Sequence, residues 1–459
     1  MWGHVKFGGD ILRSGIESSD PYSFGSDRPW INHEWLAEVT MHLSWAGGAN
    51  VGLITAKTLF ALVTVGFVLA VLSRIPMSPG LQLLLIFAVL AGIRARIYVF
   101  RPQIFSLALF AALLWILRSV EAGSTRRLWF VPLVFVLWVN LHGGWIVGLG
   151  AFGLWSVLNL TPWRSYQGSS RQIVTTLAAA VLATLVNPYG LGMWNFILET
   201  VRLDRAAISD WQPLLNTGSA KIVAWGTAAI LGGIALLHRR PSVPLAHVLL
   251  TVGFGAASLK VSRLDAFFSL SVVMLLASQI ADFAEGTRRR VVDADVRRWI
   301  WPAAVASAVL LVALLFPRRL SCVSLDAPWM PEREAVSWIK ASGANGRLLT
   351  WFDWGQYAIW HLAPGMQVSF DGRRETVYSG TYIHHHTDLY FKPETQLDFL
   401  DRLDVTRAWL AVDLPLVRLL ERRGWTRAAS GPKSVLLVRD GHALPAPNPI
   451  HSAACFPGP

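Results

Sequence analysis

The sequence predicts an all-helical, polytopic membrane bundle followed by a small α/β domain. Hydrophobic residues make up 53% of the 459 residues and charged residues only 15%, against ~25% charged residues in a typical soluble domain. The mean hydropathy is +0.43. Apolar segments of near-membrane length follow one another from residue 49 to residue 316. After residue 320 shorter helical and strand patterns alternate, with Gly and Asp at the turns between them.

The formal net charge of +12 belongs to the hydrophobic part of the chain. Residues 1–319 hold 27 Lys and Arg against 15 Asp and Glu, whereas residues 320–459 hold 14 of each. A basic protein can bind nucleic acid, but here the basic residues punctuate apolar helices, which is typical of membrane topology. We therefore expect membrane lipids, and not nucleic acid, among the partners.

The first 48 residues are expected to form an outer loop that ends in an interfacial helix. Residues 1–34 are polar and contain neither a membrane-length segment nor the pattern of a signal peptide. From 35 to 47 apolar side chains recur at helical spacing, with Glu38 and His42 between them. This pattern indicates a short amphipathic helix at the membrane interface.

Residues 49–319 are expected to form a transmembrane domain of about ten helices. Several of the apolar segments are shorter than the ~20 residues that a straight span needs. The expected spans are 49–73, 79–93, 103–118, 128–141, 144–160, 172–187, 222–238, 243–259, 264–282 and 299–316.

The loops between these spans alternate in character. One set carries thirteen arginines, which marks the cytoplasmic side: Arg74, Arg118, Arg126, Arg127, Arg164, Arg171, Arg239, Arg240, Arg288, Arg289, Arg290, Arg297 and Arg298. The other set carries five polar motifs: Asn32-His33-Glu34-Trp35, Arg101-Pro-Gln103, Asn140-Leu-His-Gly-Gly144, Asn187-Pro-Tyr-Gly190 and Lys260-Val-Ser-Arg263. Each motif alone could be a turn. Five on one face, under a topology drawn from arginines alone, predict a site on the extracytoplasmic side.

Residues 320–440 are expected to form an extracytoplasmic α/β domain, because the last span leads to the same side. Residues 441–459 contain five prolines and are expected to be disordered. Cys322 and Cys455 could pair in an exported domain, but the Pro-rich surroundings of Cys455 favour free thiols. The expected elements are helices at 331–342, 394–403 and 414–423, and strands at 347–351, 367–370, 406–412 and 434–438.

Glu34 and Asp20 are the candidate catalytic acids. Both lie in the first loop beside aromatic residues. A carboxylate can act as general base toward an acceptor hydroxyl, or it can bind a divalent cation such as Mg²⁺ or Mn²⁺. The alternatives are a solvated loop acid or a helix cap, and Asp20 also begins an Asp-Pro turn. No cofactor beyond such an ion is expected.

Four cations are candidates for binding a phosphate. Lys57 lies roughly 12 Å into the span 49–73, from a rise of ~1.5 Å per residue. A charge at this depth faces a cavity or a partner, so Lys57 either pairs with an acid of the first loop or meets a lipid phosphate. Arg101, Lys260 and Arg263, at the outer ends of helices, suit a phosphate leaving group. Their alternative role is interfacial snorkelling.

Asn140, His33 and His142 complete the candidate set for substrate binding. The two imidazoles could orient a substrate or bind a metal, although their spacing is not a metal signature. The run His384-His385-His386 falls in an expected loop, and consecutive residues rarely converge on one ion. Asp371-Gly-Arg-Arg374 follows an expected strand and either faces the membrane site or closes a turn.

Several of these motifs are familiar as a set. They are Ile11-Leu-Arg-Ser-Gly15, Asp20-Pro-Tyr-Ser-Phe24, Arg28-Pro-Trp-Ile-Asn-His-Glu-Trp35, Arg101-Pro-Gln-Ile-Phe-Ser106, Asn140-Leu-His-Gly-Gly144 and Asn187-Pro-Tyr-Gly190. The set resembles bacterial GT-C glycosyltransferase-like membrane proteins, nearest to poorly characterised members. The resemblance covers most of the chain, including the small C-terminal domain.

The resemblance implies a many-helix fold in the bacterial cytoplasmic membrane, a polyprenyl-phosphate-linked sugar as donor and an acid in the first outer loop. In relatives such as protein mannosyltransferases, that acid directly follows the first membrane helix. This sequence opens at Met1-Trp-Gly-His4 with neither in front of it. We expect either that both precede Met1 or that they have been lost. Glu34 and Asp20 are the acids that carry over.

The expected function is transfer of a sugar from a polyprenyl-phosphate donor to an acceptor at the extracytoplasmic face. An acid of the first loop would activate the acceptor, and the cations would hold the lipid-linked phosphate. Inversion at the sugar carbon is implied by the resemblance alone. The alternative is a non-catalytic polytopic membrane protein that binds lipid-linked glycans or scaffolds envelope enzymes. A transporter has less support, because few charges lie inside the spans.

Overall fold

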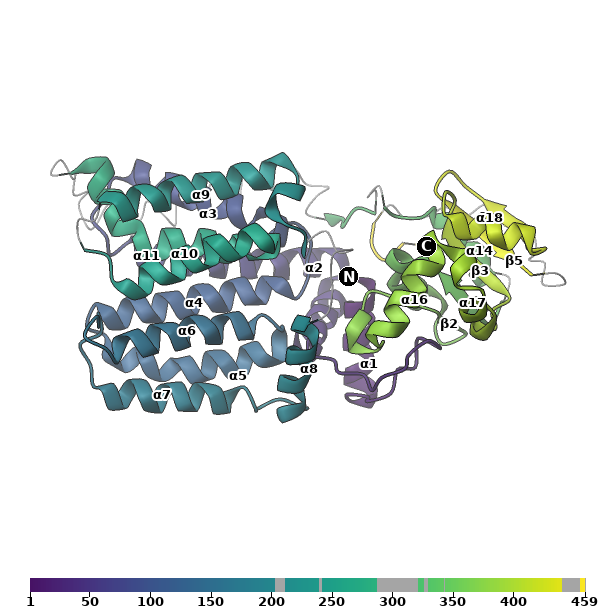
Figure 1. Cartoon of the computed structure of the whole chain (residues 1–459), viewed down its shortest axis with the longest axis horizontal. Coiled ribbons are helices and arrows are strands. Elements are labelled where there is room, and N and C mark those ends of the chain that lie inside the picture. The colour runs from purple at the N-terminus through teal and green to yellow at the C-terminus, as the bar shows by residue number, and fades with distance from the viewer. Residues whose placement is uncertain are drawn as a thin grey trace. The chain divides into compact units, whose positions relative to one another are not determined.

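The computed structural model describes residues 1–202, 211–238, 242–286, 321–325, 329–341, 343–439 and 455–458. The chain divides into two compact units. One combines Met1–Ile54 with Phe316–Pro459 and is called the mixed unit; the other, Thr55–Leu315, is called the helical unit. Figure 1 labels the elements of both, and each unit is described by itself.

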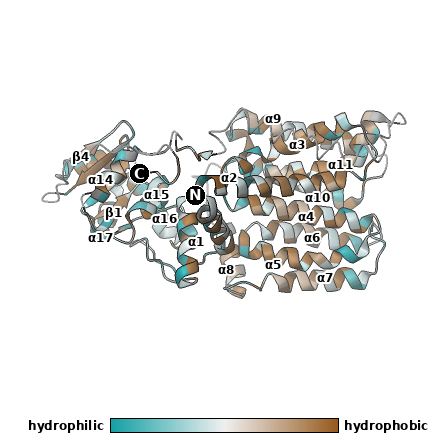
Figure 2. Cartoon of the chain, turned by 180° about the vertical axis from the view of Figure 1, so that it is seen from behind, coloured by the Kyte–Doolittle hydropathy of each residue, from teal (hydrophilic) through white to brown (hydrophobic). Residues whose placement is uncertain are grey.

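The helical unit is a bundle of apolar helices (Figure 2). Within the described residues, five helices are long and apolar enough to cross a membrane: α2, α3, α4, α9 and the segment Ser262–Ala284. Their number, length and composition are those of a multi-pass membrane protein. The bounds are α2 (Trp35–Leu72), α3 (Pro79–Tyr98), α4 (Gln103–Glu121), α5 (Val131–Leu141), α6 (Trp145–Asn159), α7 (Ser170–Ala183), α8 (Leu191–Arg202), α9 (Ser219–His238), α10 (Leu245–Lys260) and α11 (Asp265–Glu285).

All but the last of the expected spans coincide with helices. The expected span 299–316 lies outside the described residues, as do Arg239, Arg240 and the arginines from 288 to 298. Helices α6, α7 and α10 are apolar but shorter than the five long ones. The total of ten crossings therefore stays a prediction.

Helix α2 is interrupted at Gly48 and Ala49. Gly48 has φ −168° and ψ 20°, and Ala49 has φ 46° and ψ −129°. A positive φ is rare for a residue with a side chain, so the break is a defined feature of the chain. It separates the helix expected from 35 to 47 from the span expected from 49. The interfacial position of the first part stays a prediction.

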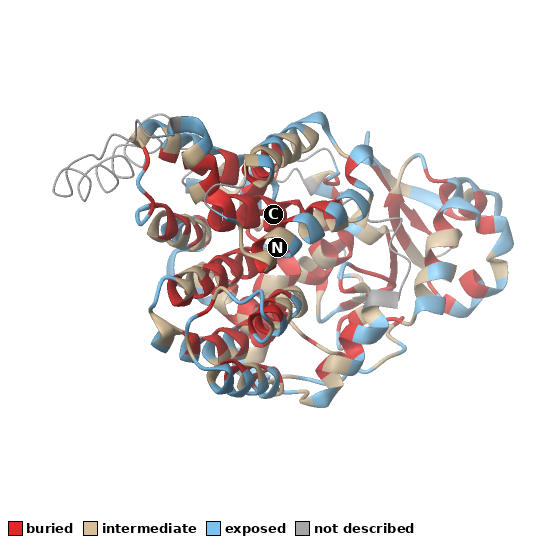
Figure 3. Ribbon diagram, turned by 60° about the vertical axis from the view of Figure 1, so that its left-hand side comes forward, coloured by how far each residue is buried: buried red, intermediate tan, exposed pale blue. Residues whose placement is uncertain are grey.

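Helix α11 lies at the centre of the helical unit, packed against α3, α4, α9 and α10. Leu270, Met274 and Leu276 on this helix are fully buried. Buried residues, red in Figure 3, concentrate inside the helical bundle and along the strands of the sheet.

Contacts between the connections show which of them meet at the same end of the helical unit. The α3–α4, α5–α6 and α10–α11 connections meet at what we call the motif end, where Arg263 contacts Gln103 and His142. The α2–α3, α4–α5 and α6–α7 connections lie at the opposite end. We call it the arginine end, and there Arg74 contacts Ser119. Which end faces the cytoplasm stays a prediction.

The mixed unit contains a five-stranded sheet of order β2-β1-β3-β5-β4. Strands β2, β1 and β3 are parallel, whereas β3, β5 and β4 are antiparallel. The expected small α/β domain is thus confirmed. The elements are α1 (Trp2–Ser14), α14 (Arg333–Ala341), β1 (Gly346–Thr350), α15 (Gly355–Leu362), β2 (Met366–Val368), α16 (Gly380–Phe391), α17 (Leu397–Leu403), β3 (Arg407–Ala411), α18 (Pro415–Arg422), β4 (Thr426–Ser430) and β5 (Ser434–Val438).

The three-histidine run lies in helix α16, so the expectation of a loop there is wrong. Ser379 caps this helix by accepting from the backbone N–H of Tyr382. His384 lies 3.5 Å from Asp388, whereas His386 is buried. Because neighbours on a helix point in different directions, the imidazoles do not meet at one point.

The first loop is bound along the edge of the sheet. The carbonyl of Tyr22 accepts from the N–H of Val368 at 3.0 Å, and the N–H of Phe24 donates back to the Val368 carbonyl at 3.2 Å. Further along, Asp27 and Ile31 donate to carbonyls of the segment that follows β2. The loop therefore extends β2 as a short parallel bridge.

Cys322 and Cys455 form a disulfide, so the expectation of free thiols is wrong. The residues beside Cys455 are anchored: Phe456 is buried, and the Pro457 carbonyl accepts from Trp2 Nε1 at 2.8 Å. This packing holds Cys455 against its partner. Of the tail 441–459 that was expected to be disordered, residues 441–454 and 459 lie outside the described residues.

Candidate functional site

Arg263 is the centre of a polar cluster at the motif end. It lies in the short turn η4 (Ser262–Leu264) between α10 and α11. With the Gln103 amide oriented to face it, Arg263 donates to the Gln103 carbonyl oxygen from Nε at 3.1 Å and Nη2 at 2.7 Å. Nη2 also lies 2.9 Å from Nε2 of His142. The Trp211 ring centre is 5.6 Å from Cζ. These neutral partners set the orientation of the guanidinium.

His142 is held on both sides of its ring. Nδ1 lies 2.7 Å from Ser106 Oγ and 3.0 Å from the backbone nitrogen of Gly144. Ser106 Oγ also accepts from Trp138 Nε1 at 2.7 Å. Each ring nitrogen thus faces an N–H donor, Arg263 at Nε2 and Gly144 at Nδ1. A neutral imidazole has one acceptor nitrogen, so it can accept from only one of these two N–H groups at a time.

Asn140 connects this cluster to the fourth motif. Its Nδ2 donates to the carbonyls of Val136 and Val186, each at 2.8 Å. Asn187, which follows Val186, accepts from the N–H of Tyr189 at 2.8 Å through its side-chain oxygen. This bond closes a local turn. Residues of three of the five motifs are therefore linked within the helical unit, and Asn140 also contacts Val186, the residue just before the fourth motif. The remaining motif belongs to the mixed unit.

The other candidate cations make different contacts. Lys57 Nζ donates to the carbonyl of Tyr98, the last residue of α3, at 3.1 Å. Such a carbonyl lacks a partner within its helix, and a cation is favourable beside it. Arg101 and Lys260 are exposed, and neither forms an ion pair within the described ranges. No direct contact brings these three into the Arg263 cluster.

Asp265 was not predicted from the sequence, although it is a buried acid at the motif end. It is 3% exposed, with Oδ1 3.7 Å from Arg96 Nη2 and Oδ2 3.7 Å from Lys221 Nζ. Lys221 also donates to Ser262 Oγ at 3.0 Å. The signal that could have found it is a carboxylate at the start of an apolar helix, where a charge needs partners.

In the mixed unit, Glu34 lies beside two imidazoles. Its Oε2 is 3.9 Å from His4 Nδ1, and its Oε1 is 3.6 Å from His33 Nε2. One helical turn later, Glu38 lies 3.0 Å from His4 Nδ1 and accepts from Asn32 Nδ2 at 2.5 Å. The Glu34 side chain is 18% exposed and that of Glu38 only 5%. Glu34 is thus the more accessible acid.

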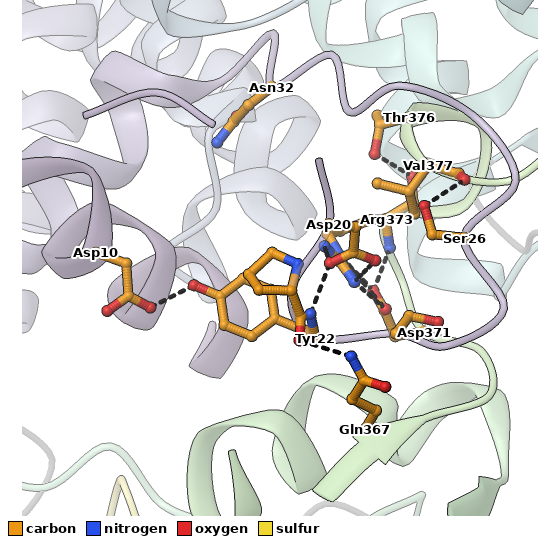
Figure 4. Close-up of polar contacts among 12 residues, drawn as sticks. Asp10, Asp20, Tyr22, Ser26, Asn32, Gln367, Asp371, Arg373, Thr376 and Val377 are labelled. Atoms are coloured by element: carbon orange, nitrogen blue, oxygen red, sulfur yellow. Dashed lines mark hydrogen bonds and ion pairs between the residues drawn. The ribbon is translucent and has the colours of Figure 1, made fainter. Parts of the chain in front are cut away.

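Asp20 forms a two-pronged ion pair with Arg373, shown in Figure 4. Its Oδ1 accepts from Nη1 at 2.6 Å and its Oδ2 from Nη2 at 2.8 Å. Asp371 accepts from the same guanidinium, at 2.7 Å from Nη2, and from the hydroxyl of Tyr378. Burial opposes the charge on Arg373, but Asp371 and Asp20 raise its pKa well above the usual range. Asp371-Gly-Arg-Arg374 thus closes a turn and also binds the first loop.

Three aromatic rings pack around the guanidinium of Arg373. Its Cζ lies 5.1 Å from the Phe7 ring centre, 4.9 Å from that of Trp30 and 5.4 Å from that of Tyr22. A small pocket beside them is lined by these rings and by Asp10, whose carboxylate accepts from the Tyr22 hydroxyl (Figure 4). Ring faces and a carboxylate can contact the apolar and hydroxyl groups of a ligand.

The expected divalent ion can be tested only against the part of the chain that the structure describes. Among the described residues, no three His, Cys, Asp or Glu side chains are arranged to hold a metal. The Mg²⁺ or Mn²⁺ dependence therefore stays a prediction.

Comparison with known proteins identifies similar folds. The sequence matches no model of a known protein family, and no curated protein matches it. The apo oligosaccharyltransferase of Archaeoglobus fulgidus matches with a TM-score of 0.53 at 12% identity, over 90% of this chain and 65% of that one. AglB of the same organism, in complex with an inhibitory peptide and a dolichol-phosphate, matches with a TM-score of 0.54 at 10% identity, over 90% and 65%. The arabinofuranosyltransferase AftD from Mycobacteria matches with a TM-score of 0.51 at 15% identity, over 95% and 39%.

The chain spans less than two thirds of the length of these proteins. At such low identity the likeness concerns the fold. It confirms the fold that the outer-loop motifs predicted: the chain has the GT-C-like fold of these glycosyltransferases.

Proposed function

We propose that this protein is a GT-C-type glycosyltransferase of the bacterial cytoplasmic membrane. It moves a sugar from a polyprenyl-phosphate donor to an acceptor at the extracytoplasmic face. The observation that supports this most is the Arg263 cluster, because an oriented guanidinium lies at the motif end of a GT-C-like bundle.

The Arg263 cluster suits the phosphate of the donor. In the proposed reaction the bond between the sugar carbon and the phosphate oxygen breaks, and a bond to the acceptor oxygen forms. Negative charge then develops on the departing phosphate, and a pre-oriented guanidinium stabilises it. Gln103 and His142 are neutral groups that orient Arg263. AglB was solved with a dolichol-phosphate, and we propose a lipid phosphate of this class for the present chain.

Glu34 is the acid that we propose for the acceptor step. It would take the proton of the acceptor hydroxyl as that oxygen attacks the sugar. Its carboxylate is partly accessible and lies near His4 and His33. Asp20 is instead fully buried against Arg373, so we assign it the positioning of the first loop.

The disulfide supports an extracytoplasmic position for the mixed unit. Disulfides persist in oxidising compartments and are rare in the cytosol. Cys322 and Cys455 both belong to this unit. A multi-pass protein with its mixed unit outside would present the first loop to extracytoplasmic acceptors.

The proposal is tested by measuring transfer from a labelled polyprenyl-phosphate sugar in membranes that contain the full protein. Arg263→Gln should reduce transfer by about 10²-fold, because one preorganised donor is worth about that much. Arg171→Gln is the matched control. Arg171 is exposed at the arginine end, and its substitution removes the same charge away from the cluster. Equal transfer by Arg263→Gln and wild type would refute a role for the cluster.

Glu34→Gln separates catalysis from folding. The change keeps the volume and removes the basicity, so transfer should fall by about 10²-fold or more at an unchanged melting temperature. Wild-type protein that binds a polyprenyl-phosphate sugar but transfers it to no acceptor would favour the non-catalytic, glycan-binding alternative.

A further inference from the structure

Two arginines at the arginine end of the helical unit converge on a single oxygen atom. Arg74, just after α2, donates from Nη1 to Ser119 Oγ at 2.8 Å. Arg127, in the turn η1 (Thr125–Phe130), donates from its own Nη1 to the same atom at 2.9 Å. Ser119 lies in the last turn of α4 and is fully buried. Two segments thus bring like charges together from different parts of the chain.

Among the residues that the structure describes, no carboxylate pairs with Arg74 or Arg127. Their shared partner is a neutral hydroxyl. The nearby acid Glu121 is bound instead to Arg118 and His247. Burial, and then the like charge of Arg127, lower the pKa of Arg74. An anion placed between the two guanidiniums would relieve this repulsion.

Aromatic residues near the two arginines favour a phosphate ligand, and one of them holds Arg127 in place. The Trp115 ring lies under Arg127, with its centre 4.8 Å from Cζ. The adjacent Trp129 and Phe130 are 54% and 56% exposed. Aromatic residues of this kind are enriched where a membrane protein meets lipid headgroups. Basic pockets between transmembrane helices bind phosphate-bearing headgroups.

We propose that Arg74, Arg127 and the Ser119 hydroxyl form a binding site for a phosphate group, carried by an anionic lipid headgroup or by a soluble phosphate. Each guanidinium can present paired N–H donors to phosphate oxygens, and the hydroxyl can contact a third oxygen.

This site is separate from the Arg263 cluster. Gln103 begins α4 and Ser119 lies in its last turn, so at ~1.5 Å per residue the two positions are about 24 Å apart along the helix. One phosphate cannot occupy both. The inference therefore stands even if the proposed transferase activity fails.

The test measures binding by the full protein in phosphatidylcholine nanodiscs. Phosphatidylglycerol is titrated in one arm and inorganic phosphate in the other, with the melting temperature and native mass spectrometry as readouts. Arg74→Gln and Arg127→Gln should each weaken binding about tenfold or more, the worth of a charge-assisted hydrogen bond. Arg126→Gln is the control: it removes an exposed charge from the same turn, and should cost no more than the fewfold general attraction of one basic residue.

The two arms identify the source of the phosphate. Stabilisation by phosphatidylglycerol alone assigns a lipid headgroup, and stabilisation by inorganic phosphate assigns a soluble ligand. If Arg127→Gln does not fold because Trp115 loses its contact, Arg74→Gln and Ser119→Ala carry the test, since Ser119→Ala keeps both charges and removes the shared oxygen. An equal loss in Arg126→Gln, or no effect of either ligand on the wild type, would overturn the proposal.

Discussion

Replacing Arg373 by glutamine should destabilise the mixed unit by about 3–5 kcal/mol, the usual cost of breaking a buried ion pair. The Asp20 side chain is 0% exposed and that of Arg373 is 5% exposed. Asp371 is also fully buried and shares the guanidinium. Without Arg373, two carboxylates would remain close together, away from water and without a cation. The first loop would then lose its main attachment to the segment after β2.

Asp20→Asn should cost less, about 1–3 kcal/mol. The amide oxygen can still accept from Arg373 and from the N–H of Tyr22, which donates to Asp20 at 2.9 Å in the wild type. Arg373 would also keep its pair with Asp371. Because the two side chains are in direct contact, the double variant should fall short of the sum by about 0.5–3 kcal/mol.

Thermal unfolding followed by tryptophan fluorescence measures these effects. A domain of 150–250 residues loses about 2–4 °C per kcal/mol, so Arg373→Gln should melt roughly 6–20 °C lower. Arg422→Gln, which breaks the exposed pair with Glu394, is the control and should cost at most about 1 kcal/mol. An unchanged melting temperature for Arg373→Gln would refute the reasoning. Loss of transfer in Asp20→Asn without any loss of stability would show that Asp20 is catalytic.

Three further predictions follow from the two units. Protein isolated from the membrane should contain the Cys322–Cys455 disulfide, seen as the absence of alkylation before reduction; a free thiol in most molecules would contradict the extracytoplasmic position. Burial lowers the pKa of His386 to about 3, against ~6.5 when unfolded, so its neutral form stabilises the fold above pH ~6.5. Stability should then fall by up to about 1.4 kcal/mol per pH unit below that value, and His386→Phe should flatten the dependence of the melting temperature on pH between 6 and 4. Arg263→Lys should keep the charge but lose the fork that Gln103 holds, so transfer should drop about tenfold or more while the yield of folded protein stays normal.

The helices of the bundle could be predicted because membrane length and apolarity are local properties of the sequence. The break in α2 was also visible, since Gly47-Gly48-Ala49 follows an amphipathic stretch. In the C-terminal part, β-branched and aliphatic runs such as Ser434–Val438 were recognised as strands. Helix α16 was missed because its Tyr and His residues have only modest helix propensity, and it is held by its cap and by burial of Leu389 and Tyr390.

The pairing of site residues was predictable only in part. The topology placed several motifs at one end of the bundle, and contacts such as Arg263 with His142 now join them. Nothing in the sequence indicates that Ser106 would contact the His142 ring and accept a hydrogen bond from Trp138. Such contacts depend on how helices rotate about their axes, which periodicity alone does not determine. The disulfide was missed for a related reason, because its two cysteines are 133 residues apart and a Pro-rich segment precedes one of them.

The first loop shows why residue type alone does not assign a catalytic acid. Asp20 and Glu34 are both carboxylates beside aromatic residues, and the sequence separates them only by the Asp-Pro turn that Asp20 begins. Their environments differ because Arg373, 353 residues beyond Asp20, forms two hydrogen bonds with it. Burial raises the pKa of the Asp20 carboxyl, although the neighbouring Arg373 opposes this shift, and both carboxylate oxygens are occupied by Arg373, so Asp20 has no oxygen directed at an acceptor. Glu34 lies beside the imidazoles of His4 and His33, and its carboxylate is partly accessible. We therefore expect the proton of an acceptor to pass to Glu34, while the charge of Asp20 holds in place the loop that carries it.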